Sequence, residues 1–588
     1  MDRVRENAAR YRLRTAAHHG GLARVFRPCP LTGRDVTLIS SILNVVLMKT
    51  PLSTSPPGWR DLPPAEHTIR TYFDAFGPVP AWDRLVEWPA DVYCLCSLVL
   101  DQTEAYRFAI APPFTRRWPP MPDWNARVEA SARDWATGAL PWFLRRHWNV
   151  LRQAGDTTLS AIRAGEAWEV CEALLTLHAL ADEAHAGLDA PTPPEGAADR
   201  MRRAWSLLGL AGTLSNVSSR RVRVLPKSGF TPRGITIRSM SRYLALCYES
   251  VEVHWGRIES EVRALAAGPG ERPYNVLLVP WPRNVRAGDF RPVRGPLENM
   301  DATEFGFFEF APEESTSGDD LESLLEASAA RADRVDAVVL PEAAILLDQL
   351  PVLEEIMERF GVRFLITGVR QPGIDGALGR NYVHFGALSD RGWQRYEQDK
   401  HHRWCLDGNQ IRQYHLARSL DPAKLWWEAI DVRPRALNVI DVGGGATAAP
   451  LVCEDLARMD EVADLLRRIG PTIVVAVLLD GPQLSSRWPR RYAAILADEP
   501  GSAVLTLTAY GMVRRSRPEG LPLSRVIALW NDRLGGIQEI ALARGAQGVL
   551  LETMVRPRTT WTADGRRHEM VPEIVFVGSR QIRSGRVR

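Results

Sequence analysis

The sequence predicts a mixed α/β protein in which a mainly helical first part precedes a layered α/β second part. Two observations support this prediction. Apolar residues recur at helical spacing before residue 187, whereas short apolar runs alternate with helical stretches after residue 274. A chain of 588 residues is too long for one ordinary core. We therefore expect three parts, which span residues 1–187, 197–270 and 274–588.

The composition is typical of a soluble globular protein, with 45% hydrophobic and 24% charged residues. The formal net charge of +3 is small for this length, so it gives no argument for nucleic-acid or membrane binding. Nucleic acid is a possible partner, but nothing in the composition supports it. No signal-peptide pattern follows Met1, and no apolar run is long enough to span a bilayer. We expect a cytoplasmic protein without membrane contact.

Before residue 274, helical periodicity predicts helices over residues 126–136, 140–154, 161–184, 197–214 and 241–267. The proline-rich stretch 190–196 is typical of a linker. Alternating Val and Arg around Arg221 and Arg223 predict a strand with one basic face. Such a face is either solvated or contacts nucleic acid or an acidic partner. The seven cysteines are scattered and odd in number, which does not indicate a disulfide framework.

In the second part, strands and helices alternate as in a layered α/β domain. The predicted strands are 274–280, 336–341, 362–368, 381–389, 393–399, 436–442, 448–453, 472–479 and 503–508, followed by a hairpin of 525–530 and 538–542. The predicted helices are 319–332, 353–360, 460–469 and 486–496.

Three of the predicted strands end in residues that suit the cleavage of a C–N bond. Cys453 closes the run Ala449-Pro-Leu-Val, Glu342 follows Val338-Val-Leu-Pro, and Lys400 follows Tyr396-Glu-Gln-Asp. A thiol, a carboxylate and an ammonium supply a nucleophile, a proton shuttle and an oxyanion stabiliser. A nearby lysine also lowers a thiol pKa, whereas a carboxylate alone raises it. Each residue taken singly has a common structural role, as a core cysteine, a surface glutamate or a solvated lysine.

In order and spacing, these motifs resemble the nitrilase, or carbon–nitrogen hydrolase, superfamily over about residues 274–552. The resemblance implies a four-layer α-β-β-α sandwich in which Glu342, Lys400 and Cys453 form a catalytic Glu-Lys-Cys triad. It also implies a thioester intermediate, no cofactor, and assembly into a homo-oligomer, either a dimer or a filament. No metal site is expected, because the adjacent His401 and His402 would point to opposite faces of a strand. Cys453-Glu454-Asp455 resembles the motif of members that hydrolyse a glutamine side chain, so Glu454 and Asp455 are expected to support the substrate.

The chain departs from that family at the second glutamate, which commonly lies seven or eight residues after the lysine. Here Asp407 and Gly408 occupy those positions. Three interpretations stay open. Asp407 takes the role, Glu428 reaches in from an insertion at 404–428 that is longer than the family's, or the role is absent.

The sequence therefore predicts a cysteine-dependent hydrolase of a non-peptide C–N bond in an amide, a glutamine-like compound or a nitrile. The N-terminal region would regulate or target it. The alternative is a catalytically silent nitrilase-like scaffold or sensor that acts in assembly or in bacterial anti-phage defence. This second hypothesis arises because the domain is similar to one found beside defence-associated reverse transcriptases. Residues 1–270 hold no Tyr-x-Asp-Asp polymerase signature, so the chain is not expected to be the polymerase.

Overall fold

The computed structural model describes the chain from residue 67 onward with several gaps. The described residues are 67–77, 79–188, 198–229, 234–258, 270–293, 300–314, 318–332, 334–373, 377–443, 446–516 and 523–584. All of them belong to one compact unit, Pro64–Arg588. The stretch 190–196, predicted to be a linker, lies outside the described residues.

The larger of two main sheets has eight strands. They are β4 (Arg272–Leu278), β7 (Ala337–Val339), β8 (Ile345–Leu346), β9 (Phe364–Gln371), β10 (Arg380–Ser389), β11 (Gly392–Asp399), β20 (Gly548–Trp561) and β21 (Arg567–Ile582). Their spatial order is β11-β10-β9-β7-β4-β20-β21, and β8 pairs with β9. β7 is parallel to β4 and β9. The strands predicted between residues 274 and 399 all lie in this sheet.

The second main sheet has seven strands. They are β3 (Glu252–Arg257), β14 (Ala436–Gly443), β15 (Ala446–Val452), β16 (Ile473–Leu478), β17 (Ala503–Thr508), β18 (Val526–Asp532) and β19 (Gly536–Ala541). Their order is β19-β18-β17-β16-β15-β14-β3, with β15, β16 and β17 mutually parallel. The strands predicted between residues 436 and 542 all lie in this sheet.

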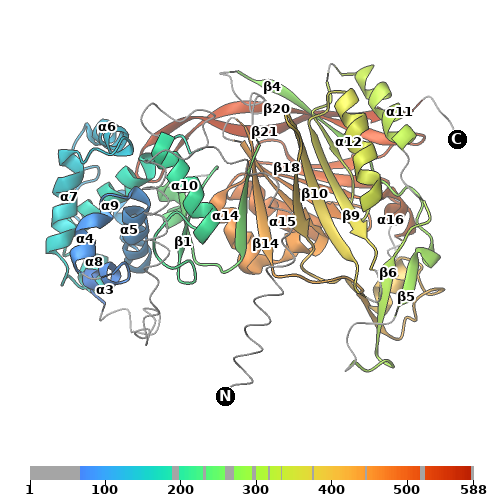
Figure 1. Ribbon diagram of the computed structural model, residues 1–588, viewed down its shortest axis with the longest axis horizontal. Coiled ribbons are helices and arrows are strands. Elements are labelled where there is room, and N and C mark those ends of the chain that lie inside the picture. Colours follow the sequence, from blue (N-terminus) through green and yellow to red (C-terminus); the bar gives the residue numbers. More distant parts are fainter. Residues whose placement is uncertain are drawn as a thin grey trace, which may run out of the picture. The chain divides into compact units, whose positions relative to one another are not determined.

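Strand alternation divides the core into layers, because successive side chains point to opposite faces of a sheet. In β4, Val276 and Leu278 pack between the two sheets, whereas Leu277 packs on the outer face, as does Val279 just after the strand. That outer face is covered by α11 (Gly318–Ala329) and α12 (Leu350–Arg359). On the second sheet, α15 (Trp488–Asp498) packs on β17 and β18. Figure 1 shows these helices outside the two sheets, and the predicted four-layer α-β-β-α sandwich is confirmed.

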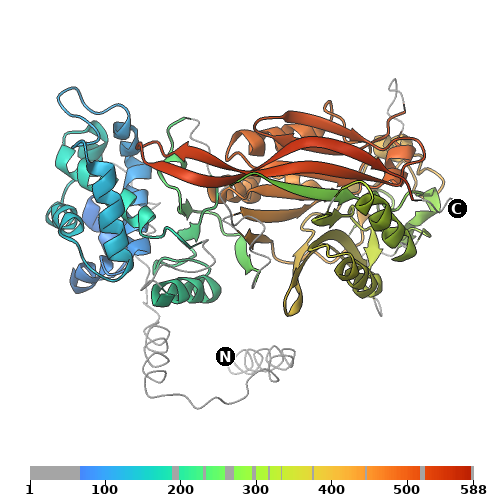
Figure 2. The same cartoon turned by 90° about the horizontal axis from the view of Figure 1, so that it is seen from above.

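β20 and β21 form a long antiparallel hairpin, paired from Gly548–Ile582 to Trp561–Arg567. In Figure 2 this red hairpin runs along the sandwich and reaches the N-terminal helices. The sequence analysis places its last hairpin at 525–542 and misses this one. The strands beyond Glu552 mix arginine, proline and threonine with apolar residues, so they lack the clean alternation that predicts a strand.

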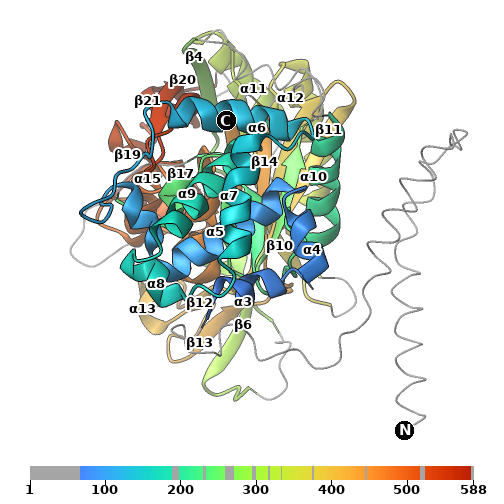
Figure 3. The ribbon, with the colours of Figure 1, turned by 90° about the vertical axis from the view of Figure 1, so that its left-hand side faces the viewer.

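The N-terminal region is helical as predicted. Its helices are α3 (Ile69–Asp74), α4 (Val79–Leu85), α5 (Pro89–Thr103), α6 (Trp124–Ala136), α7 (Trp142–Gln153), α8 (Leu159–Ala164) and α9 (Trp168–Glu183). α5 and α9 are buried on nearly all sides and pack against one another at the centre of the group (Figure 3). The single helix predicted over 161–184 is wrong, because Gly165 ends α8 in the left-handed conformation with φ 77°.

The connecting region contributes to the sandwich. α10 (Ala198–Ala211) matches its prediction, β1 (Arg223–Pro226) pairs with β2 (Leu244–Cys247), and β3 adds in parallel to β14. The helix predicted over 241–267 is therefore wrong for its described part, since Val251 and Val253 are buried on either side of exposed Glu252. The predicted basic strand face is also wrong at Arg223, which is buried and donates to the Glu249 carbonyl at 2.5 Å.

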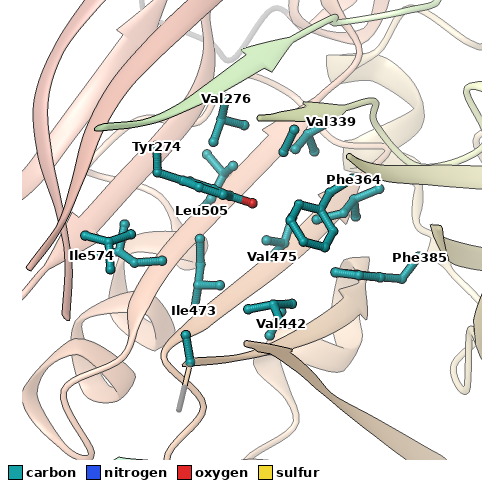
Figure 4. A pocket seen from close by; sticks show the side chains of 15 residues that line it. Tyr274, Val276, Val339, Phe364, Phe385, Val442, Ile473, Val475, Leu505 and Ile574 are labelled. Carbon is teal, nitrogen blue, oxygen red and sulfur yellow. The ribbon is translucent and has the colours of Figure 1, made fainter. Parts of the chain in front are cut away.

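A cavity of about 40 Å³ lies between the two main sheets (Figure 4). Apart from Tyr274, whose hydroxyl points into the space, its lining is apolar. Tyr274, Ala337 and Ile473 lie at or near the amino ends of their strands. The cavity thus occupies the end of the sandwich opposite the carboxyl ends of the parallel strands.

A small four-stranded sheet covers the carboxyl ends of those strands. It consists of β5 (Phe290–Val293), β6 (Phe305–Phe310), β12 (Cys405–Leu406) and β13 (Leu425–Glu428), in the order β12-β13-β6-β5, and is accompanied by α13 (Gly408–Gln413). Its apolar side chains, among them Trp404 and Tyr414, cluster with Ala343 and Leu479 of the sandwich. The insertion at 404–428 therefore folds as part of this cover.

Two further short helices, α14 (Asp464–Ile469) and α16 (Tyr510–Arg515), complete the described elements of the sandwich. Among the helices of the described residues, none combines the length and the apolarity that crossing a bilayer requires.

Candidate active site

Glu342, Lys400 and Cys453 lie at the carboxyl ends of strands from both main sheets. Glu342 follows β7 after a two-residue gap, Lys400 directly follows β11, and Cys453 directly follows β15. The first two residues come from the eight-stranded sheet and the third from the seven-stranded sheet. Ligands of open α/β sheets bind outside the carboxyl ends of parallel strands, and this is where the three residues gather.

Lys400 is clamped between two carboxylates. Its Nζ donates to Oε1 of Glu342 at 2.7 Å and to Oε2 of Glu428 at 2.6 Å. The three side chains are 1%, 0% and 6% exposed, respectively. Glu428 is the last residue of β13, so the insertion brings the second carboxylate into the site. An ammonium has three N–H donors, and these two contacts use two of those of Lys400.

Asp407 lies outside this group. It is exposed, and its carboxylate caps α13 by accepting from the Gln410 backbone N–H at 2.7 Å. Of the two carboxylates that sequence analysis offers for the second acidic position, the structure places Glu428, and not Asp407, against Lys400.

Asn381 joins the two carboxylates and was not among the predicted site residues. Its Nδ2 donates to Oε1 of Glu342 at 2.7 Å and to Oε1 of Glu428 at 2.8 Å. Its backbone carbonyl accepts from the Lys400 N–H at 2.9 Å. The signal in the sequence is its place near the start of β10, in the hairpin before Lys400, where the superfamily that the sequence resembles usually has an Asn. Pairing between β10 and β11 brings it beside Lys400.

The turns that carry Glu342 and Cys453 are strained. Ala343 has φ 53° and Cys453 has φ 46°, a region that non-glycine residues seldom adopt. Gly368 allows the first turn to lie directly on β9, because a Cβ at Gly368 would come within 2.3 Å of the Glu342 Cα. Cys453 opens a 3₁₀ turn, Cys453–Ala457.

Asp455 is buried and links the segment after Lys400 to the turn after Cys453. It accepts from the His401 backbone N–H at 3.4 Å and lies 2.9 Å from Nδ1 of His402. Glu454 is partly exposed and forms an ion pair with Arg458 at 3.2 Å. The structure therefore brings Asp455 into the framework of the site and leaves Glu454 near its edge.

A further buried carboxylate, Asp480, was missed by the sequence analysis. It accepts from Arg487 at 2.9 Å, from the Trp488 indole at 3.0 Å and from the Tyr414 hydroxyl. Its negative charge contributes to the field at the Cys453 thiol. Tyr414 follows α13, so through this contact the cover reaches the end of the seven-stranded sheet.

The charges of the site favour a neutral thiol at rest. Burial raises the pKa of Cys453 well above its ordinary value, and the Glu342 carboxylate raises it further against the opposing effect of Lys400. Burial also raises the pKa of Glu342, with Lys400 opposing and Glu428 adding to the rise. For Lys400, burial acts to lower the pKa, but Glu342 and Glu428 outweigh it and hold the pKa well above normal. The effect of Lys400 on the Cys453 pKa is therefore too small to make the thiol a thiolate against burial and the Glu342 charge.

These groups can perform acyl transfer. The unusually basic carboxylate of Glu342 can take the thiol proton, and the fixed charge of Lys400 can stabilise an oxyanion. Within the described residues, no group of three or more His, Cys, Asp or Glu side chains is arranged to hold a metal ion.

No protein-family model and no curated protein matches this sequence. Among solved structures, the chain is similar to Saccharomyces cerevisiae Nit3, a member of branch 10 of the nitrilase superfamily, at 11% identity, 50% coverage of this chain, 92% coverage of Nit3 and a TM-score of 0.31. It is also similar to XC1258 from Xanthomonas campestris, a CN-hydrolase superfamily protein with an arsenic adduct in its active site. The values are 17% identity, 48% and 90% coverage, and a TM-score of 0.28.

The C. elegans NitFhit protein is a third similar structure, at 13% identity, 48% coverage of this chain, 61% coverage of NitFhit and a TM-score of 0.29. The solved structures to which the chain is similar thus include nitrilase and CN-hydrolase superfamily proteins. Because all three identities are 17% or lower, we argue the chemistry from this chain's own contacts.

Proposed function

We propose that this protein is a cysteine-dependent hydrolase of a non-peptide C–N bond that acts through a thioester intermediate. The observation that supports the proposal most directly is the position of Lys400, whose ammonium lies between the Glu342 and Glu428 carboxylates at the strand ends that also carry Cys453. A buried ammonium between two carboxylates, next to a buried thiol in a strained turn, is costly to maintain as mere packing.

In the proposed reaction, Sγ of Cys453 attacks the carbonyl carbon while its proton passes to Glu342. Lys400 and a backbone N–H of the turn after Cys453 stabilise the tetrahedral oxyanion. The C–N bond then breaks as Glu342 returns the proton to the leaving nitrogen, which leaves a thioester. Glu342 next takes a proton from water, whose oxygen attacks the thioester, and the proton returns to the sulfur as the carboxylic acid departs.

The first test is intact mass measured after incubation with a panel of small amides and nitriles. The wild type should gain an acyl mass that disappears as hydrolysis completes, and Cys453→Ala should gain none and should lose turnover by at least about 10³-fold. Cys405→Ala is the matched control, because Cys405 lies on β12 outside the triad. Turnover that persists in Cys453→Ala would rule out the assignment.

A catalytically silent scaffold is the second candidate, and one observation favours it. The side chains of Glu342 and Lys400 are 0% and 1% exposed, and Cys453 is 3% exposed, so the site is closed beneath the small sheet. The absence of an adduct with every compound would favour this scaffold, acting in assembly or in anti-phage defence. Under either function, we propose that residues 1–187 regulate or target the sandwich and that the protein forms homo-oligomers.

A further inference from the structure

The orientation of the Asn381 amide is set by its neighbours. Its Nδ2 faces one oxygen of Glu342 and one of Glu428, both within 2.8 Å. A carboxylate only accepts hydrogen bonds, so the reverse orientation would place the amide oxygen against two acceptors. The NH₂ group must therefore face the carboxylates, and Oδ1 must face away from them.

Among the described residues, two buried acceptors in the site have no hydrogen-bond donor. Oδ1 of Asn381 and Oε2 of Glu342 are both inaccessible to solvent and have no hydrogen-bond partner among the described residues. Asn381 is 4% exposed and Glu342 is 0% exposed. Buried polar atoms in folded proteins are nearly always paired, and an unpaired one is costly. Both unpaired atoms belong to side chains beside Lys400. The ammonium of Lys400 has a third N–H beyond its two contacts with carboxylates, and this N–H can only donate.

This pattern defines the ligand that would pair these atoms. Such a ligand donates N–H groups toward Asn381 and Glu342 and presents an oxygen to Lys400. A primary carboxamide or a ureide carries both features, the NH₂ group and the oxygen, on one carbonyl carbon. A nitrile has no N–H, and neither does an N,N-disubstituted amide. A site built to hydrogen-bond a substrate N–H rejects analogues that lack it, because its buried acceptors then stay unpaired.

We propose that Asn381 is a specificity-determining residue whose Oδ1, together with Oε2 of Glu342, accepts the N–H groups of the nitrogen to be released. The proposal rests on the proposed hydrolase function and narrows its substrates to N–H-bearing primary amides and ureides, to the exclusion of nitriles. Donation by Nδ2 to the two carboxylates holds the oxygen in place for this contact.

The test compares two alkylating probes that react with Cys453 without needing turnover. Iodoacetamide carries an NH₂ group, and N,N-dimethyl-iodoacetamide carries none. In both reactions an S–C bond forms, iodide leaves, and the thiol proton passes to Glu342. Each rate constant for Cys453, measured by peptide mass spectrometry, is divided by the rate constant of the same probe with glutathione. The wild type should favour iodoacetamide by at least about tenfold after this correction.

Asn381→Leu should reduce that preference to near one. Leucine is close to asparagine in size, so the variant removes the acceptor without opening space for the bulkier probe. Any general damage to the site slows both probes and cancels in the ratio. The matched control is Asn275→Leu in β4, since Asn275 is also buried but donates to the Arg334 carbonyl. This control should retain the wild-type preference.

Three results would overturn the inference. They are a wild-type preference near one, a preference that survives in Asn381→Leu, and a folded wild type whose Cys453 is alkylated by neither probe. Near-UV circular dichroism shows whether Asn381→Leu folds. If it does not, the inference is tested by the corrected ratio of the two alkylation rates in the wild type and in Asn381→Ala. Alkylation does not require hydrolysis, so the two proposals can fail separately. A preference for iodoacetamide without any thioester would reject the proposed hydrolase function and would still support the role of Asn381.

Discussion

At the scale of single residues, the site is governed by an excess of negative charge around one ammonium. Glu342 and Glu428 both contact Lys400, and Asp480 adds its field at the thiol. Together with burial, this excess keeps Cys453 protonated at rest. The reactive thiolate must then arise only as the proton moves to Glu342, so the basicity of that carboxylate controls the reaction.

Glu428→Gln tests this control through pH. The Glu428 charge raises the pKa of Glu342, because two nearby carboxylates resist ionising together. Its removal should lower the pKa of Glu342, so more of this base is ionised at acid pH. The acid limb of the pH profile for Cys453 alkylation by iodoacetamide should therefore move to lower pH, by about one unit.

Asp407→Asn is the matched control for Glu428→Gln, since Asp407 is exposed and caps α13. It should leave the acid limb in place. An equal shift in both variants, or none in Glu428→Gln, would show that Glu428 does not act on Glu342 as its position indicates.

At the scale of elements, alternate side chains of each strand in the sandwich pack on opposite faces of its sheet. In β15, Ala448 faces the space between the sheets and lines the cavity, whereas Ala449 is absent from that lining and is fully buried. The same substitution at these neighbours should therefore have opposite effects, because one side chain meets a void and the other meets packed atoms.

Ala448→Val should raise the stability of the sandwich by about 1 kcal/mol, because it places two further carbons in an apolar void of about 40 Å³. Ala449→Val should lower stability by about 1–3 kcal/mol through overpacking. Urea denaturation of both variants measures the difference. Equal destabilisation by the two substitutions would mean that the space beside Ala448 is too small to accept a methyl group.

At the scale of the whole molecule, the β20–β21 hairpin fastens the sandwich to the N-terminal helices (Figure 2). Arg566 at its tip is 1% exposed and forms ion pairs with Asp182 at 3.0 Å, Glu183 at 2.7 Å and Asp564 at 3.0 Å. Asp182 also accepts three backbone N–H groups from 242–244. One guanidinium therefore balances carboxylates from the helices and from the hairpin.

Arg566→Met should destabilise the protein by about 3–5 kcal/mol, because it leaves buried carboxylates without their counter-ion. Arg567→Met is the matched control. Its ion pair with Glu569 has side chains 61% exposed, so its loss should change stability by less than about 1 kcal/mol. Chemical denaturation followed by tryptophan fluorescence measures both. A small effect of Arg566→Met would show that the junction does not depend on this charge cluster.

The sequence by itself determined the order of the main strands of the two large sheets between residues 274 and 542, and the position of Glu342, Lys400 and Cys453 at strand ends. Both are local properties, because hydrophobic periodicity and the residue that follows a strand are read from neighbours along the chain. The sequence analysis missed the strands of the small sheet, β5, β6, β12 and β13. The error at 241–267 arose where short strands lacked a long period, and the helix break at Gly165 depended on one positive φ.

Only the tertiary structure decided that Glu428 and not Asp407 contacts Lys400, that Asn381 joins the two carboxylates, and that Asp480 lies within the field of Cys453. These residues lie far apart along the chain and meet through sheet order, strand register and the packing of an inserted sheet. No periodic pattern encodes such contacts, because they depend on which distant strands pair. The same reason explains why the β20–β21 hairpin was missed. Its polar strands are held by contacts with β4 in the sandwich and with the N-terminal helices, both distant along the chain.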